Sequence, residues 1–354
     1  MRYLVWMLRL GFAAWLIPAG LNHFYPLFPQ PLGNQPESTA LIVALIDTGL
    51  FAIVKAVELF AGLCLLFGWR VPLALVLQLP VSFNVWYWDV PLQGWGSISA
   101  YYGWGVLGAN LVLMLAWHRS YLSLLSPVAA FRWPPSLRPE IRPSTTGIAR
   151  KLKPARWLLG VLLLIGALNH FLGQALPVPM ATTPLAAQLL DALYLSRLID
   201  VAMAIQLVAG AAMLANLFVP LALAAVMPVN ICALFWALVL EQSAGWSLAA
   251  GLLVTLGALL MFALLPAYRT MLAAYPLAAG EAREEGQRYE RVYIWLTGEM
   301  PPTAFALALL PVLAAAAFFH FLLPESLAYH CLLVLLCPLV VLVLRLAKGL
   351  LAKP

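Results

Sequence analysis

Charged residues are scarce in this chain. Only 10% of its 354 residues are charged, and 64% are hydrophobic, whereas about a quarter of the residues of a soluble globular domain are charged. Several apolar runs reach the ~20 residues that a helix needs to cross a bilayer. The composition therefore excludes an ordinary soluble domain and predicts a polytopic membrane protein whose main partner is the lipid bilayer.

Cysteine pairs and nucleotide-binding motifs are also missing. The four cysteines lie in apolar runs without CxxC spacing, which predicts buried thiols and no disulfide or zinc framework. The sequence has no phosphate loop, dinucleotide fingerprint, nucleophile elbow or HExxH motif. These absences exclude transport driven by nucleotide hydrolysis and predict no metal site. They leave open whether the protein is an enzyme, and no catalytic residue is assigned.

The positive charge is concentrated in one connector. Eight of the 20 Lys and Arg residues lie between Arg119 and Arg156, where Glu140 is the one acid. Such clustering beside apolar spans is typical of the cytoplasmic side of a membrane protein and not of a nucleic-acid groove. We therefore expect no nucleic-acid partner, a bacterial inner-membrane location and both termini in the cytoplasm.

The apolar runs predict an all-α integral membrane protein, because lipid leaves only helices to satisfy the backbone of an open segment. We expect ten transmembrane helices at about 4–25, 42–68, 71–88, 98–117, 156–174, 186–214, 217–240, 245–266, 303–323 and 327–346.

An Asn-His motif recurs along the chain. Leu21–Phe24 is repeated letter for letter at Leu168–Phe171, 147 residues later, and Phe319–Phe321 is a partial third copy. The segment Ala56–Gly62 likewise matches Ala204–Gly210. Each repeat holds four predicted spans, and an even number gives both repeats the same orientation. We therefore expect two parallel four-helix-bundle repeats and a C-terminal helical hairpin.

This organisation divides the chain into five segments. They are a first four-helix unit (1–120), a basic cytoplasmic linker (121–154), a second four-helix unit (155–268), a charged cytoplasmic connector (269–301) and a transmembrane hairpin (302–354).

Ionisable residues within the second span are the first candidates for function, since each costs roughly 2.5–3.5 kcal/mol to insert into a membrane. Lys55 and Glu58 are three residues apart and are predicted to pair on one helix face. Glu58 lies ~18 Å from Arg70 at 1.5 Å per residue, near the middle of the membrane. One interpretation is that the pair holds the bundle together; the other is that Glu58 handles protons or binds a ligand.

The second unit carries a related set of polar residues. Arg197 and Asp200 are also three apart, and Gln206 replaces Glu58. If one unit is active, this replacement favours the first.

The Asn-His motif has several interpretations. A hydrogen bond from His23 to Asp47 is predicted, because both lie at similar depth toward the outer face. Alternatively, Asn22 and His23 cap the helix and hold the following loop, and Asn169 and His170 do so in the second unit. A quinone headgroup site is a third interpretation, in which the Asn and His side chains donate to the carbonyls. Haem ligation by pairs among His23, His170 and His320 is disfavoured, because equivalent positions in separate bundles need not meet.

These segments resemble the DoxX-like membrane protein family. The residues that carry the resemblance are Leu21–Phe24, Ala56–Gly62, Leu65–Gly68 and Val71–Ala74. It covers residues 3–120 well and 155–270 more weakly, and this chain departs from the pattern by fusing two units and adding a hairpin. The resemblance implies four-helix integral membrane units, and relatives such as DoxD are linked to thiosulfate–quinone oxidoreduction.

The favoured functional hypothesis is a membrane subunit of a quinone-linked redox system. It would bind a lipid-soluble ligand near Asn22, His23, Asp47, Lys55 and Glu58, and it would act with a redox partner protein. One alternative is a non-catalytic scaffold that anchors a partner through its connectors. The other is a transporter of a small or lipidic solute. A quinone is compatible with the site as a cofactor, although the sequence does not identify one.

Overall fold

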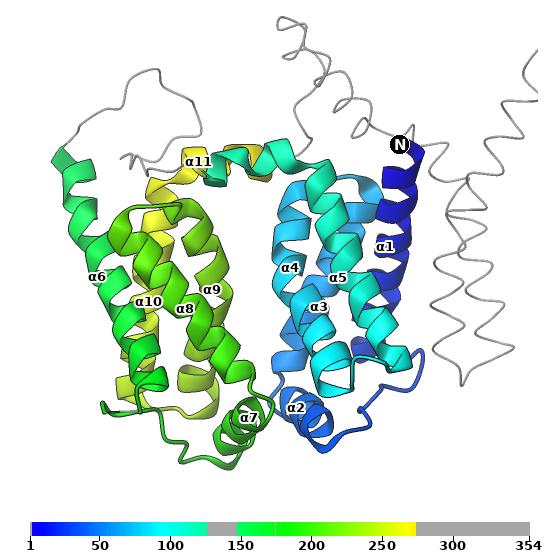
Figure 1. The fold of residues 1–354 in the computed structure, drawn as a ribbon, viewed down its shortest axis with the longest axis horizontal. Helices are drawn as coiled ribbons and strands as arrows, with labels where there is room; N and C mark the ends of the chain where they lie inside the picture. The colour runs from blue at the N-terminus through cyan, green and yellow to red at the C-terminus, as the bar shows by residue number, and fades with distance from the viewer. Residues whose placement is uncertain (1, 126–146, 174, 274–354) are drawn as a thin grey trace, which may run out of the picture. The chain divides into compact units, whose positions relative to one another are not determined.

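The computed structural model describes residues 2–125, 147–173 and 175–273, and every regular element within these ranges is helical (Figure 1). Eight helices in these ranges are long and apolar enough to cross a membrane. The prediction of an all-helical fold is confirmed within these ranges, and the length and composition of the eight helices suit a membrane protein. The expected spans at 303–323 and 327–346, most of the charged connector and His320 lie outside the described residues.

The described residues form two compact units, of which unit 1 contains Met1–Gly33 and Leu50–His118. Its four long helices are α1 (Arg2–Phe24), α3 (Leu50–Phe67), α4 (Val71–Tyr87) and α5 (Ile98–Ala116). Helix α1 packs against α3 and α5, and α4 packs against the same two helices. The four helices therefore enclose a single bundle core.

Unit 2 contains Arg119–Thr270 together with Asn34–Gly49. Its long helices are α6 (Gly147–Phe171), α8 (Leu198–Ala215), α9 (Val219–Phe235) and α10 (Ala244–Ala263). Helix α6 packs against α8 and α10, and α9 packs against the same two. Successive long helices thus meet in the same order in both units.

Shorter elements link the long helices. A π-helical turn follows the third long helix of each unit, η1 (Trp88–Leu92) after α4 and η3 (Trp236–Leu240) after α9. A 3₁₀ helix, η2 (His118–Leu125), begins the basic linker, and α11 (Leu265–Leu272) follows α10.

The expected spans at 42–68 and 186–214 are wrong as single helices. Each is divided into a short helix, α2 (Pro36–Asp47) or α7 (Pro184–Leu195), and the long helix that follows it. After α2, the Thr48 hydroxyl donates to the Ala44 carbonyl at 2.7 Å, and Gly49 has φ +77. A glycine in this left-handed conformation is a common helix stop. Apolar runs flank each break closely on both sides, so hydropathy averaged over a window does not reveal it.

The short helices α2 and α7 pack against each other within unit 2. Gln188 of α7 donates from Nε2 to the Asp47 carboxylate of α2 at 2.7 Å. Helix α2 therefore belongs to unit 2, whereas the helices before and after it in the sequence belong to unit 1. Asp47, the last residue of α2, lies in unit 2 as a result.

Glycine lets the first two long helices of unit 1 approach closely. A Cβ atom at Gly20 of α1 would lie 2.8 Å from both the Leu59 amide nitrogen and the Lys55 carbonyl oxygen of α3. Small residues at crossing points permit such packing between membrane helices. The turn of α3 that carries Lys55 and Glu58 is thereby held directly against α1.

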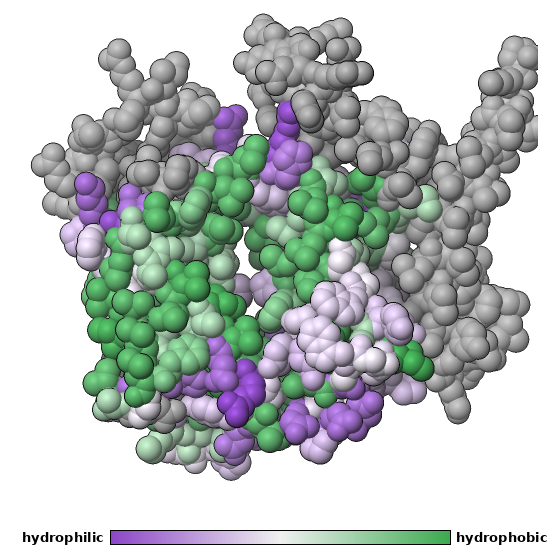
Figure 2. Space-filling model, viewed as in Figure 1, coloured by the Kyte–Doolittle hydropathy of each residue, from purple (hydrophilic) through white to green (hydrophobic). Residues whose placement is uncertain are grey.

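Apolar side chains cover the outside of both bundles. Only 22% to 44% of each apolar helical window is buried within the protein. Figure 2 shows hydrophobic residues over the visible helices of unit 2, with hydrophilic residues gathered toward their ends. This is the surface that lipid requires, since the hydrocarbon solvates apolar side chains but not polar ones.

Candidate functional site

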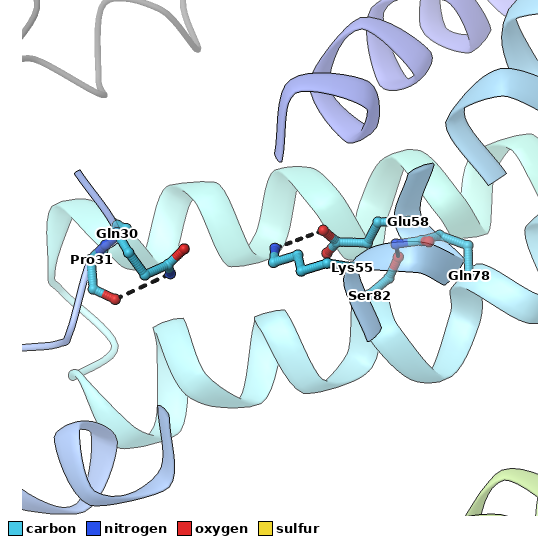
Figure 3. Close-up of polar contacts among 6 residues, drawn as sticks. All are labelled: Gln30, Pro31, Lys55, Glu58, Gln78 and Ser82. Atoms are coloured by element: carbon cyan, nitrogen blue, oxygen red, sulfur yellow. Dashed lines mark hydrogen bonds and ion pairs between the residues drawn. The ribbon is translucent and has the colours of Figure 1, made fainter. Parts of the chain in front are cut away.

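An ion pair lies inside the bundle of unit 1. Lys55 Nζ and Glu58 Oε2 are 2.6 Å apart, with side-chain exposures of 12% and 4% (Figure 3). The Lys55 ammonium also lies 4.9 Å from the centre of the Phe51 ring. The i,i+3 pairing expected from the sequence is confirmed. The Glu58 carboxylate is shielded from solvent and keeps its charge partner on its own helix.

Three uncharged polar side chains extend this polar region into α4 and α5. Gln78, Ser82 and Asn110 are fully buried. The Gln78 and Asn110 amides donate to the Ser82 hydroxyl at 3.5 and 3.0 Å. Gln78 Oε1 and Asn110 Oδ1 have no hydrogen-bond partner. Two buried acceptors are therefore left unsatisfied, which is costly in an apolar core.

The corresponding core of unit 2 is simpler. Gln206, which replaces Glu58, donates from Nε2 to Asn230 Oδ1 at 3.3 Å, and both side chains are buried. Asn230 Nδ2 has no partner. The unit 2 core therefore lacks the ion pair and leaves an unsatisfied donor where unit 1 leaves unsatisfied acceptors.

The asparagine of the repeated motif holds the loop that follows its helix. Asn22 Oδ1 accepts hydrogen bonds from the Leu27 and Phe28 amides, both at 2.8 Å. Asn169 Oδ1 accepts from the Leu176 amide at 2.7 Å. In both units the asparagine holds the loop after its helix, as one interpretation of the motif predicts. Its acceptor oxygen is therefore occupied.

The two motif histidines have different environments. The His23 ring meets Phe24 and Phe51 edge to face, at 5.2 and 5.3 Å between centroids. His170 Nε2 lies 2.8 Å from Asp200 Oδ1. A histidine–carboxylate pair therefore exists in unit 2, although the sequence favoured one in unit 1.

The expected His23–Asp47 hydrogen bond is replaced by a different arrangement. Asp47 accepts from Gln188 in unit 2, whereas His23 belongs to unit 1. The reason is the helix break at Gly49, which separates Asp47 from the helix that carries Glu58.

In unit 2, Arg197 lies 3.6 Å from Asp200 but is mostly exposed, so it contributes little to the core.

Two acids that lie just beyond the expected spans at 71–88 and 217–240 are buried. Asp89 lies in η1, is 6% exposed and accepts from Gln93 Nε2 at 3.3 Å. Glu241, also 6% exposed, accepts from the Thr182 hydroxyl at 2.6 Å and the Thr182 amide at 2.8 Å. These hydrogen bonds lower the pKa of the Glu241 carboxyl.

Acids and histidines in the sequence do not indicate the uncharged part of the unit 1 core. The spacing of Gln78 and Ser82, four residues apart on an apolar helix, does indicate one polar face. Asn110 has no such local partner. Within the described residues, no group of three or more His, Cys, Asp or Glu side chains is arranged to hold a metal ion.

Comparison with protein-family models, curated proteins and solved structures gave no match for this chain.

Proposed function

We propose that unit 1 binds a lipid-soluble ligand of the quinone class, and that the protein is a membrane subunit of a quinone-linked redox system. The observation that carries the proposal is the buried polar core of unit 1, in which Gln78 Oε1 and Asn110 Oδ1 lack partners. Natural cores rarely leave buried acceptors unpaired, so such groups call for an explanation.

The chemistry of the core suits the reduced form of such a ligand. A quinol hydroxyl is a donor and complements an amide acceptor, whereas a quinone carbonyl does not. Glu58 lies on the neighbouring helix α3, where its carboxylate supplies further acceptor capacity beside the Lys55 charge. The site is thus defined by Glu58, Gln78, Ser82 and Asn110. Asn22 is committed to the loop.

The remaining parts of the proposal concern the whole chain. We propose ten transmembrane helices, arranged as two parallel DoxX-like repeats and a C-terminal hairpin, in a bacterial inner membrane with both termini cytoplasmic. Eight candidate spans and the basic linker support this organisation. A redox partner protein would exchange electrons with the bound ligand.

Binding of a short-chain quinol to the purified protein tests the proposal. We expect saturable binding of decylubiquinol, and tighter binding than of its oxidised form. Asn110→Leu and Gln78→Leu should each weaken quinol binding about tenfold, the equivalent of one buried hydrogen bond. The matched control is Gln206→Leu, which removes a buried amide from unit 2 and should leave binding unchanged.

The Gln206→Leu control in unit 2 distinguishes a loss of quinol binding from a general loss of bundle stability. Absence of quinol binding by the folded wild type would overturn the proposal. Equal weakening by Gln206→Leu and Asn110→Leu would also overturn it, because the effect would then reflect bundle stability and not a site in unit 1.

A further inference from the structure

A buried arginine lies near the start of α1 without a partner. Arg9 is 5% exposed, and its Nε atom is buried without a hydrogen-bond partner. None of the ion pairs and hydrogen bonds among the described residues involves Arg9. A guanidinium is always charged, and a buried charge is costly unless an opposite charge or strong acceptor accompanies it. The Arg9 guanidinium therefore has N–H donors available for an anion.

The equivalent arginine in unit 2 donates a hydrogen bond. Arg156 lies 147 residues later on α6, is 6% exposed and donates from Nη1 to the carbonyl of Met213. Met213 is in the last turn of α8, where carbonyls carry partial negative charge, and its carbonyl also accepts from the Asn216 amide at 3.2 Å. The same residue in the same place thus has a structural role in unit 2 that Arg9 does not have in unit 1.

The turn between α3 and α4 makes room for the Arg9 side chain. A Cβ atom at Gly68 would lie 3.0 Å from Arg9 Nη1. The aligned position in unit 2, 148 residues on, is Asn216. The missing side chain at Gly68 leaves the guanidinium against the backbone of the turn.

Further donors without acceptors lie at this end of unit 1. Arg70, two residues after Gly68, donates from Nη1 to the Leu272 carbonyl at 3.1 Å, but its Nε atom is buried and unpartnered. Trp117 caps the C-terminus of α5, and its indole Nε1 is also buried without a partner. All of these groups are N–H donors, and two of them carry positive charge.

We propose that this end of unit 1 binds a phosphate-class anion between Arg9 and Arg70. Arginine is suited to this ligand, because its planar fork of N–H groups matches phosphate oxygens. Phe67 and Trp69, on the same turn, are 68% and 40% exposed. Exposed aromatic rings beside a basic site are typical of the headgroup level of a membrane. The anion is therefore expected to be the headgroup of an acidic phospholipid.

Thermal unfolding of the full-length protein in detergent tests the site and the source of its anion. Phosphatidylglycerol should raise the Tm of the wild type, whereas zwitterionic phosphatidylcholine should raise it much less. Arg9→Gln and Arg70→Gln should weaken the phosphatidylglycerol response about tenfold in apparent affinity. Arg156→Gln is the matched control; it should lower the Tm, because it removes a helix cap, but retain the lipid response. Native mass spectrometry provides a second measurement by counting phosphatidylglycerol adducts.

The outcomes separate the possible sources. Stabilisation by inorganic phosphate as well as by the acidic lipid supports the site with a phosphate-class ligand of either origin. The inference is overturned if neither probe stabilises the wild type, or if folded Arg9→Gln responds as the wild type does. Arg9→Lys, which retains the charge, should keep part of the response. This site is separate from the polar core of unit 1, so it can fail or hold independently of quinol binding.

Discussion

Lys55 and Glu58 show how much a charge pair depends on its surroundings. Arg197 and Asp200 have the same spacing in unit 2, but Arg197 is 80% exposed, whereas the Lys55 and Glu58 side chains are 12% and 4% exposed. Exposed pairs contribute about 0–1 kcal/mol. Breaking a buried pair is far more costly, because it leaves a charge without compensation.

We predict that Lys55→Met destabilises the protein by about 3–5 kcal/mol, because the buried Glu58 carboxylate loses its partner. The double variant Lys55→Met/Glu58→Leu should recover most of that loss. Arg197→Met, which breaks the exposed pair, should cost at most about 1 kcal/mol. Equilibrium unfolding of the four proteins measures these differences. Equal effects at the two pairs would show that burial of the first pair does not matter.

Glu241 predicts a dependence of stability on pH. Hydrogen bonds from Thr182 hold the pKa of this carboxyl below its ordinary value of 4.5. The stabilisation is therefore complete above pH 4.5 and is lost as the pH falls through the lowered pKa. Glu241→Gln should be less stable than the wild type at pH 7, and the difference should shrink in acid. Tm measured from pH 7 to pH 3 tests this, with the exposed Asp191→Asn as control. A difference that does not change with pH contradicts the assignment.

At the scale of elements, the breaks before α3 and α8 decide which side chains meet. Thr48 and Gly49 end α2, and Ser196 and Arg197 occupy the same place after α7. Helix α2 then packs in unit 2, and Asp47 bonds to Gln188. The helix break at Gly49 thus separates Asp47 from His23 and Glu58, which its sequence position had suggested as neighbours.

Gly49 provides a direct test of this break. Its φ of +77 is unfavourable for any residue with a Cβ atom, although open space surrounds the position. Gly49→Ala should therefore destabilise the protein by about 1–2 kcal/mol through backbone strain alone. Gly108→Ala, in the middle of α5 with equally open surroundings, should instead be neutral or stabilising. Thermal unfolding compares the two. The same sign for both variants would contradict a left-handed conformation at Gly49.

At the scale of the whole molecule, two bundles with the same order of helix contacts carry different cores. Unit 1 has an ion pair and two unsatisfied acceptors, whereas unit 2 has a single amide pair and an unsatisfied donor. The arginine near the start of the first helix also differs, since Arg156 caps a helix and Arg9 does not. The same bundle architecture therefore carries different polar groups in the two units, and both proposed sites lie in unit 1.

The proposed topology predicts which parts of the chain are accessible from each side of the membrane. In a variant whose four cysteines are replaced by alanine, Asn34→Cys should react with an impermeant thiol reagent from outside intact cells. Ser144→Cys, in the basic linker, should react only after the cells are opened, because positive charge is retained on the cytoplasmic side. The reverse pattern would invert the orientation of every span.

The sequence by itself determined the features that depend on composition and local spacing. Apolar runs identify the membrane class and the long helices, and the i,i+3 interval places Lys55 beside Glu58. Only the tertiary structure decided that Asp47 bonds to Gln188, that Asp89 and Glu241 are buried, and that Arg9 has no partner. The physical reason is that these features depend on contacts between helices far apart in the chain. The positions of helix breaks and the closeness of helix packing determine such contacts. Neither the hydrophobic periodicity nor the hydropathy of the sequence predicts them.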